Sequence, residues 1–496
     1  MSTMRVSLIN PAFSTIYGPY QYAARVGATP QMPLGLCYIA GAARRAGHEV
    51  QLIDAEAERY PREDDLIDEI ARFRPDAVGF TATTPLIPEV ADLTKKVKKR
   101  VPGALTVVGG VHVSSVLEGI YTDRYAPEAD ACVYGEGENT FVDLLAAHEK
   151  GEPFDGVPGL LFRRDGKVVK TRSADPPVLD DLALPARDLL KVDRYQWSIP
   201  GKGIQAVTSL VTMRGCPFHC AFCEVSKIFP MKVRYRSPDR VMDEIELIQR
   251  QFGIRHLMVQ DDTLTLSRKH SLALAKKIEE RGLDLTFEGY TRADLVDEEL
   301  LVTLKEAGLV RLSFGVESGS DEILKAIRKG TTTEMYRKAY RLCKKIGIET
   351  RCSFMIGHPH ETRETVKKTI AYVNSLEVYQ AYVNVATPYP GTELFEMARQ
   401  GVGGLKLLST DWKEYRRYGN PVIEVNDLTA QDLKKLQRTA YLRFYLRPRI
   451  MAYNLRRAGW KAAFVNAVAF ARSILASLLP RAKEAPAPAV GAAGGC

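Results

Sequence analysis

The sequence contains little cysteine, with 8 cysteines among its 496 residues. Five of these stand alone along the chain: Cys37, Cys132, Cys343, Cys352 and Cys496. Cysteines scattered in this way do not form a disulfide framework, so a reducing cytoplasm is the expected compartment. Residues 1–10 also lack the basic start, apolar run and cleavage site of a signal peptide.

Acidic residues are missing from one long stretch near the C-terminus. Between Leu433 and Lys483 there are 12 Lys and Arg residues and no Asp or Glu, whereas the net charge of the whole chain is only +9. The remainder of the chain is therefore slightly acidic. No apolar run in this stretch is long enough to span a bilayer, because Arg472 interrupts the last one. Its aromatic residues accompany a long apolar run, which does not favour a nucleic-acid groove.

Residues 1–150 alternate strand and helix patterns. Short apolar runs predict buried parallel strands at 5–10, 48–55, 75–83, 104–110 and 130–137. The segments between them have the apolar spacing of helices. This alternation predicts a doubly wound, Rossmann-like α/β domain that binds its ligand at the carboxyl ends of the strands. Its first turn lacks G-x-G-x-x-G, which argues against a dinucleotide.

The rest of the chain is predicted to form four segments. Residues 151–205 form a linker that contains a hairpin with an Asp165-Gly166 turn. Residues 206–400 repeat a strand–helix unit six times, which predicts a partial (β/α)6 TIM-like barrel with its chemistry in the loops after the strands. Residues 401–483 are predicted to be helical and basic, and residues 484–496 to form a disordered tail.

The three remaining cysteines lie close together in "RGCPFHCAFC", at Cys216, Cys220 and Cys223. This loop follows the first barrel strand and so lies at the expected catalytic face. A structural zinc ion needs four ligands, and the nearby candidate for a fourth, His219, lies inside the loop. Three thiolates suit a cubane iron–sulfur cluster with one iron left open. A zinc site and three buried cysteines are the alternatives.

The motif "CPFHCAFC" resembles the signature of the radical S-adenosylmethionine (SAM) superfamily. The resemblance implies that the three cysteines hold a [4Fe–4S] cluster, and that SAM chelates the fourth iron through its amino and carboxylate groups. It also implies that the reduced cluster releases a 5'-deoxyadenosyl radical from SAM. Phe222, directly before the last cysteine, matches the aromatic residue that lies near the adenine in such enzymes.

Several strand ends in the barrel agree with this resemblance. In "QDDTLT", Asp261 or Asp262 is expected to receive the SAM ammonium, with helix N-capping as the alternative for one of them. Arg292 follows the third barrel strand, where a basic residue can meet the SAM carboxylate. "GVESGS" resembles the family's ribose- and carboxylate-binding strand end, which implies roles for Glu317 and Ser318.

A further loop, "MIGHPHET" at 355–362, resembles the Gly-Leu-Pro-Gly-Glu-Thr loop of the family. His358 and His360 replace the usual Leu and Gly. Their roles stay open at this point, since each could equally be a surface residue.

Two glycine-containing loops carry the resemblance in the N-terminal domain: "GGVHVSS" at 109–115 and "YGEGENTF" at 134–141. With the domain order, they resemble the cobalamin-binding domain of class B radical SAM enzymes. The resemblance implies cofactor contacts at Gly109, Gly110, His112, Gly135 and Glu136. An Asp-x-His-x-x-Gly sequence is missing after the first strand, which implies cobalamin without a protein His on cobalt. For His112, an ordinary loop histidine is the alternative.

The resemblance covers roughly residues 1–400. It implies a cobalamin-dependent radical SAM methyltransferase that acts on an unactivated carbon of a small substrate. Alternatives are an anaerobic oxidative cyclase of the Mg-protoporphyrin IX monomethyl ester cyclase type and a cobalamin sensor without catalysis. A methylthiotransferase is less favoured, because the N-terminal domain contains only Cys37 and Cys132 instead of a second cysteine trio.

The expected partners follow from the same resemblance and from the basic stretch. An external electron donor of the flavodoxin or ferredoxin type is expected, and nucleic acid is not. Residues 437–480 are compatible with lying on an anionic membrane, at its inner face, or with a helical cap on the barrel. Membrane contact would indicate a lipophilic substrate.

Overall fold

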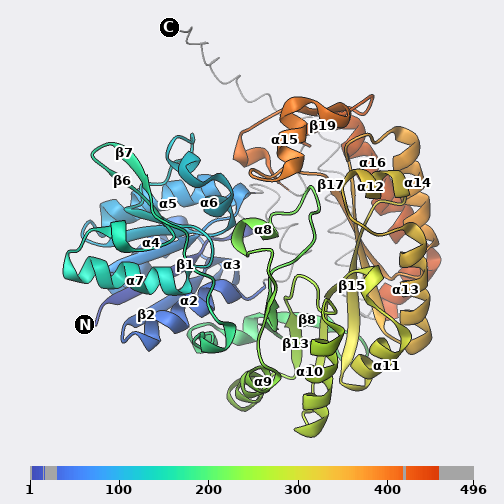
Figure 1. The fold of residues 1–496 in the computed structure, drawn as a ribbon, viewed down its shortest axis with the longest axis horizontal. Coiled ribbons are helices and arrows are strands. Elements are labelled where there is room, and N and C mark those ends of the chain that lie inside the picture. The colour runs from blue at the N-terminus through green and yellow to red at the C-terminus, as the bar shows by residue number, and fades with distance from the viewer. Residues whose placement is uncertain (1–2, 15, 17–30, 417–420, 457–496) are drawn as a thin grey trace.

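The computed structural model describes residues 3–14, 16, 31–416 and 421–456. Figure 1 shows an N-terminal α/β domain, in blue to green, beside a second domain in green to orange. The predicted fold class is confirmed: a doubly wound sheet precedes a parallel, six-stranded barrel sheet, and a helical C-terminal region follows.

The N-terminal sheet has seven strands in the order β2-β1-β3-β4-β5-β6-β7. Its strands are β1 (Arg5–Asn10), β2 (Glu49–Asp54), β3 (Ala77–Thr81), β4 (Leu105–Gly109), β5 (Ala131–Val133), β6 (Leu160–Arg164) and β7 (Lys167–Lys170). The first five are parallel and lie at the predicted apolar runs. The chain order reverses between β1 and β3, and doubly wound sheets bind ligands at the carboxyl edge near such a point.

Helices cover both faces of this sheet. They are α2 (Leu34–Arg45), α3 (Ala55–Glu58), α4 (Glu63–Phe73), α5 (Ile87–Arg100), α6 (Val111–Val116) and α7 (Gly137–Lys150). The apolar side chains of α4 and α5 belong to one buried cluster and those of α2 and α7 to another. Both faces of the parallel strands are therefore buried, which explains their nearly continuous apolar runs.

The predicted hairpin is present, and it extends the N-terminal sheet beyond residue 150. β6 pairs antiparallel with both β5 and β7. The turn residues Asp165 and Gly166 have φ values of 50° and 73°. These are the left-handed conformations that a tight two-residue hairpin needs. A second hairpin, β8 (Gln196–Ile199) with β9 (Gly203–Ala206), leads into the barrel.

The barrel sheet has the order β10-β13-β14-β15-β16-β17, and every neighbouring pair is parallel. Its strands are β10 (Thr208–Leu210), β13 (His256–Val259), β14 (Thr286–Thr291), β15 (Leu309–Glu317), β16 (Glu349–Ile356) and β17 (Gln380–Val385). The helices between them are α8 (Val225–Ile228), α9 (Pro238–Phe252), α10 (Arg268–Glu280), α11 (Glu298–Glu306), α12 (Asp321–Ala326), α13 (Thr333–Ile346), α14 (Arg363–Ser375) and α15 (Glu393–Gln400). The six predicted strand–helix steps are all present.

The C-terminal region, predicted to be helical, also contains two short strands. Its first part forms a short antiparallel pair, β18 (Leu405–Leu407) and β19 (Ile423–Val425). The glycines of "GVGG" at 401–404 end helix α15, and the alternation of "LKL" and "IEV" then fits strands. The long helix α16 (Ala430–Tyr445) comes only after this pair.

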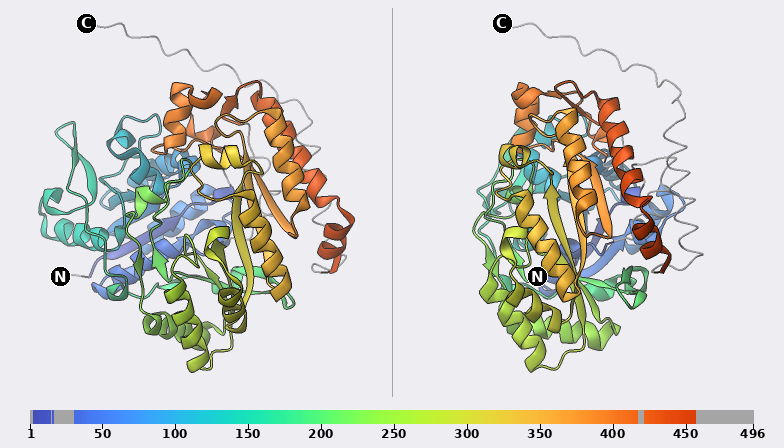
Figure 2. Two further views of the ribbon diagram at one scale, coloured as in Figure 1. Left: turned by 45° about the vertical axis from the view of Figure 1, so that its right-hand side comes forward. Right: turned by 90° about the vertical axis from the view of Figure 1, so that its right-hand side faces the viewer.

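Helix α16 covers the open edge of the barrel sheet, where β17 has no further strand neighbour. Figure 2 shows α16, in red, alongside this orange end of the sheet. Tyr445 Oη donates to Ala381 O at 3.0 Å, and Gln437 Nε2 donates to Val383 O at 2.8 Å. Side chains of a helix thus satisfy the backbone groups that an exposed edge strand would leave unpaired.

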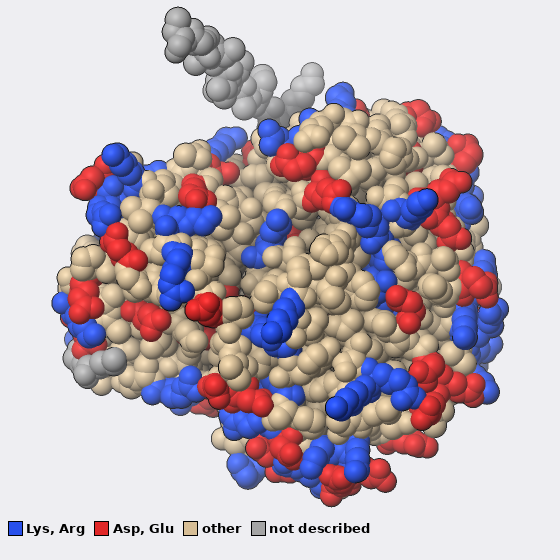
Figure 3. Space-filling model, in the orientation of Figure 1, with Lys and Arg blue, Asp and Glu red and all other residues tan. Residues whose placement is uncertain are grey.

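The described helices include none that is both long and apolar enough to cross a membrane. Positive and negative side chains are interspersed on the face that Figure 3 shows. Most of the basic stretch that carries the charge excess, from residue 457 onward, lies outside the described residues, as does the predicted tail at 484–496.

Candidate functional site

The three clustered cysteines lie in a loop between two short paired strands, β11 (Met213–Arg214) and β12 (Arg234–Tyr235). All three thiols are free and half-buried. The loop begins at Gly215, whose φ is +97°. A Cβ there would lie 2.8 Å from Pro230 O, so only glycine permits the chain to turn here.

The cysteine loop fits a cluster better than a single ion. In the described ranges, no group of three or more His, Cys, Asp or Glu side chains is arranged to hold one metal ion. In a cubane cluster each thiolate binds its own iron, so the three thiols need not converge on one ion. Burial raises the pKa of Cys216, and it raises the pKa of Cys223 to about 11. Deprotonation of these thiols is therefore coupled to the arrival of a cation.

The two aspartates after β13 have different surroundings. Asp261 is buried and accepts hydrogen bonds from Thr212 N at 2.7 Å, Thr212 Oγ1 at 2.5 Å and Met213 N at 3.1 Å. It thereby fixes the strand end that leads into the cysteine loop. Asp262 is half-buried beside the loop, and burial raises its pKa to about 6. Of the pair, Asp262 is the carboxylate whose charge acts on the thiols of Cys216 and Cys223.

The other predicted residues at the barrel strand ends have protein partners. Arg292 forms two contacts of 3.0 Å with Asp294, and its guanidinium lies 3.6 Å from the ring centre of Phe218 in the cysteine loop. Ser318 is buried, with its Oγ 3.1 Å from Thr369 Oγ1. Arg292 thus holds the cysteine loop against β14, while Ser318 secures the turn after β15.

Glu317 has an unusual environment at the end of β15. Its φ is 61°, and its carboxylate pairs at 3.1 Å with the buried Lys329 Nζ. Lys329 also lies 5.7 Å from the ring of Phe222. Lys329 could not be predicted from the sequence, because a lysine in "IRKGTT" has no pattern that distinguishes it from a surface residue. The structure places its positive charge beside the cysteine loop.

Unpartnered polar atoms lie next to Phe222. The His358 ring is fully buried, 6.4 Å from the Phe222 ring, and although it lies near the Glu317 backbone, neither ring nitrogen makes a hydrogen bond of good geometry with the described residues. Burial lowers the pKa of His358 to about 4, so the imidazole is neutral. In the same loop, Glu361 Oε1 lacks a partner among the described residues, although Oε2 accepts from Gly357 N at 2.5 Å and His358 N at 3.0 Å. Buried polar groups are seldom left unpaired, so these atoms fit a polar ligand such as SAM.

His360 lies apart from this cluster. Its side chain is exposed, its φ is 64°, and its backbone N donates to Gly403 O at 2.6 Å. It therefore serves the turn after β16, whereas His358 points into the protein.

The carboxyl edge of the N-terminal sheet faces the cysteine loop. Ser115 Oγ, in α6, donates to Glu224 Oε1 at 3.2 Å, and Glu224 directly follows the third cysteine. At Gly109 a Cβ would meet nothing closer than 3.6 Å, and at Gly135 nothing closer than 4.0 Å. Protein packing does not explain the missing side chain at Gly109, so this open edge fits a bulky ligand such as cobalamin.

Three predicted cobalamin contacts are engaged with the protein. A Cβ at Gly110 would lie 2.7 Å from Ala82 O, so packing alone requires glycine there. His112 is fully buried, with Nδ1 3.1 Å from Thr84 Oγ1 and its ring 5.6 Å from that of Trp412. Burial lowers the pKa of His112 to about 3. The Glu136 carboxylate is buried in ion pairs with arginines that flank the cysteine loop.

Family models match both halves of this arrangement. The model described as "Radical SAM superfamily" matches residues 210–373, and the "B12 binding domain" model matches residues 23–145. A Pyrococcus horikoshii protein known as an uncharacterized methyltransferase is 36% identical over 456 residues, which cover 91% of this chain and 94% of the relative.

Two further proteins are similar to this chain over most of its length. The anaerobic magnesium-protoporphyrin IX monomethyl ester cyclase of Rubrivivax gelatinosus is 31% identical over 91% of this chain and 79% of its own length. The radical SAM methyltransferase TsrM of Kitasatospora setae, solved with cobalamin and a [4Fe–4S] cluster, superimposes with a TM-score of 0.70 at 20% identity, covering 96% of this chain and 100% of that one. The matched families, the extent of the relatives and the facing sites agree that the chain belongs to the cobalamin-dependent radical SAM enzymes.

Proposed function

We propose that this chain is a C-methyltransferase that moves a methyl group by way of cobalamin to an unactivated carbon of a small molecule. The observation that carries the proposal is that the three-cysteine loop faces the carboxyl edge of a cobalamin-type sheet, with Ser115 of one domain bonded to Glu224 of the other. Methyltransferases among the relatives support it. A methyl carrier and a radical source must lie close together for such a reaction.

The cofactor-holding residues in this proposal come from both domains. Cys216, Cys220 and Cys223 hold the cluster. The SAM site is made by Phe222, Asp262, Arg292, Glu317, Ser318, Lys329 and His358, with Asp261 fixing the strand end. The cobalamin edge is made by the loops at Gly109–Gly110 and Gly135, with His112 beneath it. When bound, the cluster and SAM supply a hydrogen-abstracting radical, and cobalamin supplies the methyl group.

The residues of the chain orient these groups. Asp262 offers the SAM ammonium a carboxylate beside the cluster loop, and His358 offers a neutral imidazole next to Phe222. Lys329 neutralises Glu317, so that the end of β15 adds no net charge beside the cysteines. Trp412 packs over His112 and closes the cobalamin domain from the C-terminal side.

The inner side of the barrel is polar. The buried residues of β15 to β17 pack toward the helices, and half-buried residues alternate with them on the other side. Those half-buried positions include Ser313, Ser353, Tyr382 and Asn384, and Tyr290 lies in the neighbouring strand β14. Tyr290 is 41% exposed although it lies within the barrel sheet. Hydroxyl and amide groups here favour a substrate that forms hydrogen bonds near the reacting carbon.

An oxidative cyclase is the second candidate, because the Rubrivivax gelatinosus cyclase is 31% identical over most of this chain. It would use the same residues to generate the radical. It would differ in producing 5'-deoxyadenosine without consuming a second SAM for methyl transfer. The two functions therefore predict different ratios of SAM-derived products.

The finer partners are part of this proposal. A flavodoxin- or ferredoxin-type protein supplies the electron. Within the segment 437–480, the residues up to Tyr445 pack on β17, so the contact with an anionic membrane surface begins after α16, supported by the exposed Leu446, Met451 and Leu455. Arg447, Arg449 and Arg456 accompany them, so apolar and basic groups occur together as in an interfacial helix. A lipophilic portion of the substrate would be drawn from this surface.

The test is product analysis after anaerobic reconstitution with iron, sulfide and hydroxocobalamin. SAM, a strong reductant and either a polar-metabolite or a lipid extract are added, and S-adenosylhomocysteine and 5'-deoxyadenosine are quantified. Both products rising together with one extract supports methyl transfer and identifies the substrate class. 5'-Deoxyadenosine rising alone, with cobalamin retained, would replace methyl transfer by the cyclase-type reaction.

A further inference from the structure

Arg214, two residues before the first cysteine, joins the cysteine loop to the other domain. Its side chain is only 8% exposed. Nη1 lies 2.8 Å from Glu136 Oε2, and Nη2 lies 2.6 Å from Glu138 Oε1. Both glutamates lie at the start of helix α7 in the cobalamin-binding domain: Glu136, directly after Gly135, is its N-cap, and Glu138 is in its first turn. One guanidinium therefore binds two carboxylates at the point where the chain passes from the Gly135 loop into α7.

The strand that leaves the cysteine loop makes the same connection. Arg234 in β12 is the antiparallel partner of Arg214 in β11, and it also pairs with Glu136. The strands that begin and end the cysteine loop are thus both tied to one carboxylate. These four buried side chains, Arg214, Arg234, Glu136 and Glu138, are called the clasp below.

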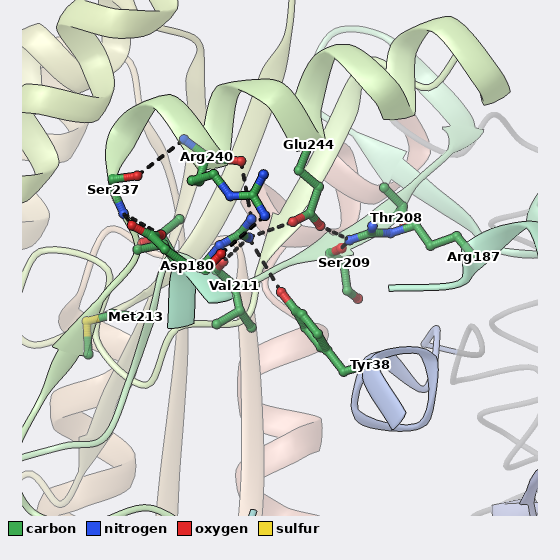
Figure 4. Close-up of polar contacts among 12 residues, drawn as sticks. Tyr38, Asp180, Arg187, Thr208, Ser209, Val211, Met213, Ser237, Arg240 and Glu244 are labelled. Carbon is green, nitrogen blue, oxygen red and sulfur yellow. Dashed lines mark hydrogen bonds and ion pairs between the residues drawn. The ribbon is translucent and has the colours of Figure 1, made fainter. Parts of the chain in front are cut away.

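A second buried network supports the clasp through Tyr38 of α2. The Arg214 guanidinium lies 4.9 Å from the Tyr38 ring centre, and the Tyr38 hydroxyl accepts a hydrogen bond from Arg236 Nη1 at 3.4 Å. Arg236 pairs with Glu244 at 2.6 Å, and Glu244 pairs with Arg187 at 2.5 Å. Figure 4 shows the Tyr38 side chain pointing from the N-terminal domain toward these ion pairs, which lie next to the helix that carries Glu244.

Buried ion pairs contribute little net stability compared with apolar packing, but separating them leaves charges unpaired in a dry environment. Their main consequence is that few alternative arrangements are tolerated. If the two domains moved relative to each other, the Glu138 carboxylate would become exposed to solvent or would stay buried without an opposite charge, because its ion-pair partner among the described residues is Arg214. The clasp therefore favours one relative position of the two loops.

We propose that Arg214 is a positioning residue that fixes the cluster-bearing loop against the cobalamin-bearing loop. It touches neither substrate nor reacting atoms, and it acts through Glu136 and Glu138. Without it, both cofactors still bind, but the distance between them varies from one molecule to another. Because small misplacements of reacting groups reduce rates steeply, radical formation then continues while methyl transfer falls.

The test uses the holoenzyme with cob(II)alamin and the reduced cluster, whose unpaired electrons report their separation by pulsed EPR. The variants are R214K, which keeps the charge but cannot bind two carboxylates side by side, and E138Q, which removes one charge at nearly constant shape. The matched control is R268K, because Arg268 also bridges two carboxylates, Asp297 at 3.2 Å and Glu299 at 2.6 Å, but on the surface.

We expect wild type and R268K to give the same narrow distance distribution. R214K and E138Q should retain iron and cobalamin but give a visibly broader distribution, and product formed per 5'-deoxyadenosine should fall about tenfold or more. Distributions of both variants that superimpose on wild type would overturn the proposal. If R214K loses a cofactor, E138Q decides by the same criterion. The distance measurement needs no substrate, so its result is independent of whether the proposed methyl transfer is correct.

Discussion

Replacing Glu361 with Gln should remove a pH-dependent loss of stability. The Glu361 side chain is buried after β16, and burial raises the pKa of its carboxyl from 4.5 to about 7, although two backbone N–H groups donate to it. The folded state therefore holds this proton more tightly than the unfolded chain. Its contribution to stability is complete below about pH 4.5 and is lost as the pH rises through about 7.

The magnitude follows from the difference between the two pKa values. At about 1.4 kcal/mol per pH unit, a shift from 4.5 to about 7 corresponds to roughly 3 kcal/mol over the full range. Between about pH 5.5 and pH 8, the same linkage relation gives a decrease of about 2 kcal/mol in the free energy of unfolding. In E361Q, whose amide oxygen can accept the same backbone hydrogen bonds, this part of the pH dependence should disappear.

The assay is urea unfolding of the purified protein followed by circular dichroism at both pH values. The free energy of unfolding of the wild type should fall relative to E361Q by about 2 kcal/mol as the pH rises. E364Q, at an exposed glutamate three residues further along, is the matched control and should follow the wild type. Parallel pH profiles for wild type and E361Q would refute the reasoning that Glu361 is protonated in the folded protein.

Three other outcomes are expected. C223A should lose most of its iron and the visible absorbance of the cluster after anaerobic reconstitution while still binding cobalamin; full iron content would contradict the ligand assignment. G319A should lower the free energy of unfolding in urea by about 1–3 kcal/mol, because the new Cβ would lie 2.6 Å from Tyr372 Cβ. The control G35A, whose Cβ would meet no atom within 4 Å, should leave the free energy unchanged or raise it by up to about 1 kcal/mol. The protein should sediment with anionic vesicles but not with neutral ones. Replacing three exposed apolar residues with Ser should reduce the bound fraction: Leu446, Met451 and Leu455. An unchanged bound fraction would exclude these residues from the membrane contact.

The regular parts of the fold could be predicted because parallel strands buried on both faces leave long apolar runs. β1 and β4 lie where the apolar pattern placed them, and the alternation of strands with helices along the chain gave the two α/β domains. The pair β18–β19 was missed because each strand has only three residues, too few for alternation to stand out. Its position depends on packing against the barrel.

The position of the cysteine loop could be predicted because its three cysteines lie close together in the sequence and follow a predicted strand. The buried ionic contacts could not, because Arg214 and Glu138 are distant in sequence and each resembles a solvated charge when read alone. The same holds for Lys329, which is buried only because Glu317 pairs with it. For Asp261 and Asp262, sequence offered two equal carboxylates, and only the backbone donors at Thr212 and Met213 distinguish their surroundings.

The most direct test of the central claim is transfer of a labelled methyl group. Reconstituted enzyme, the responding extract and SAM carrying a trideuteromethyl group are incubated under reducing anaerobic conditions, and the product is examined by mass spectrometry. The account predicts that a trideuteromethyl group replaces one hydrogen of the substrate. It also predicts one S-adenosylhomocysteine and one 5'-deoxyadenosine per product, all abolished in C223A or without cobalamin. A product that carries no label while 5'-deoxyadenosine accumulates would contradict methyl transfer.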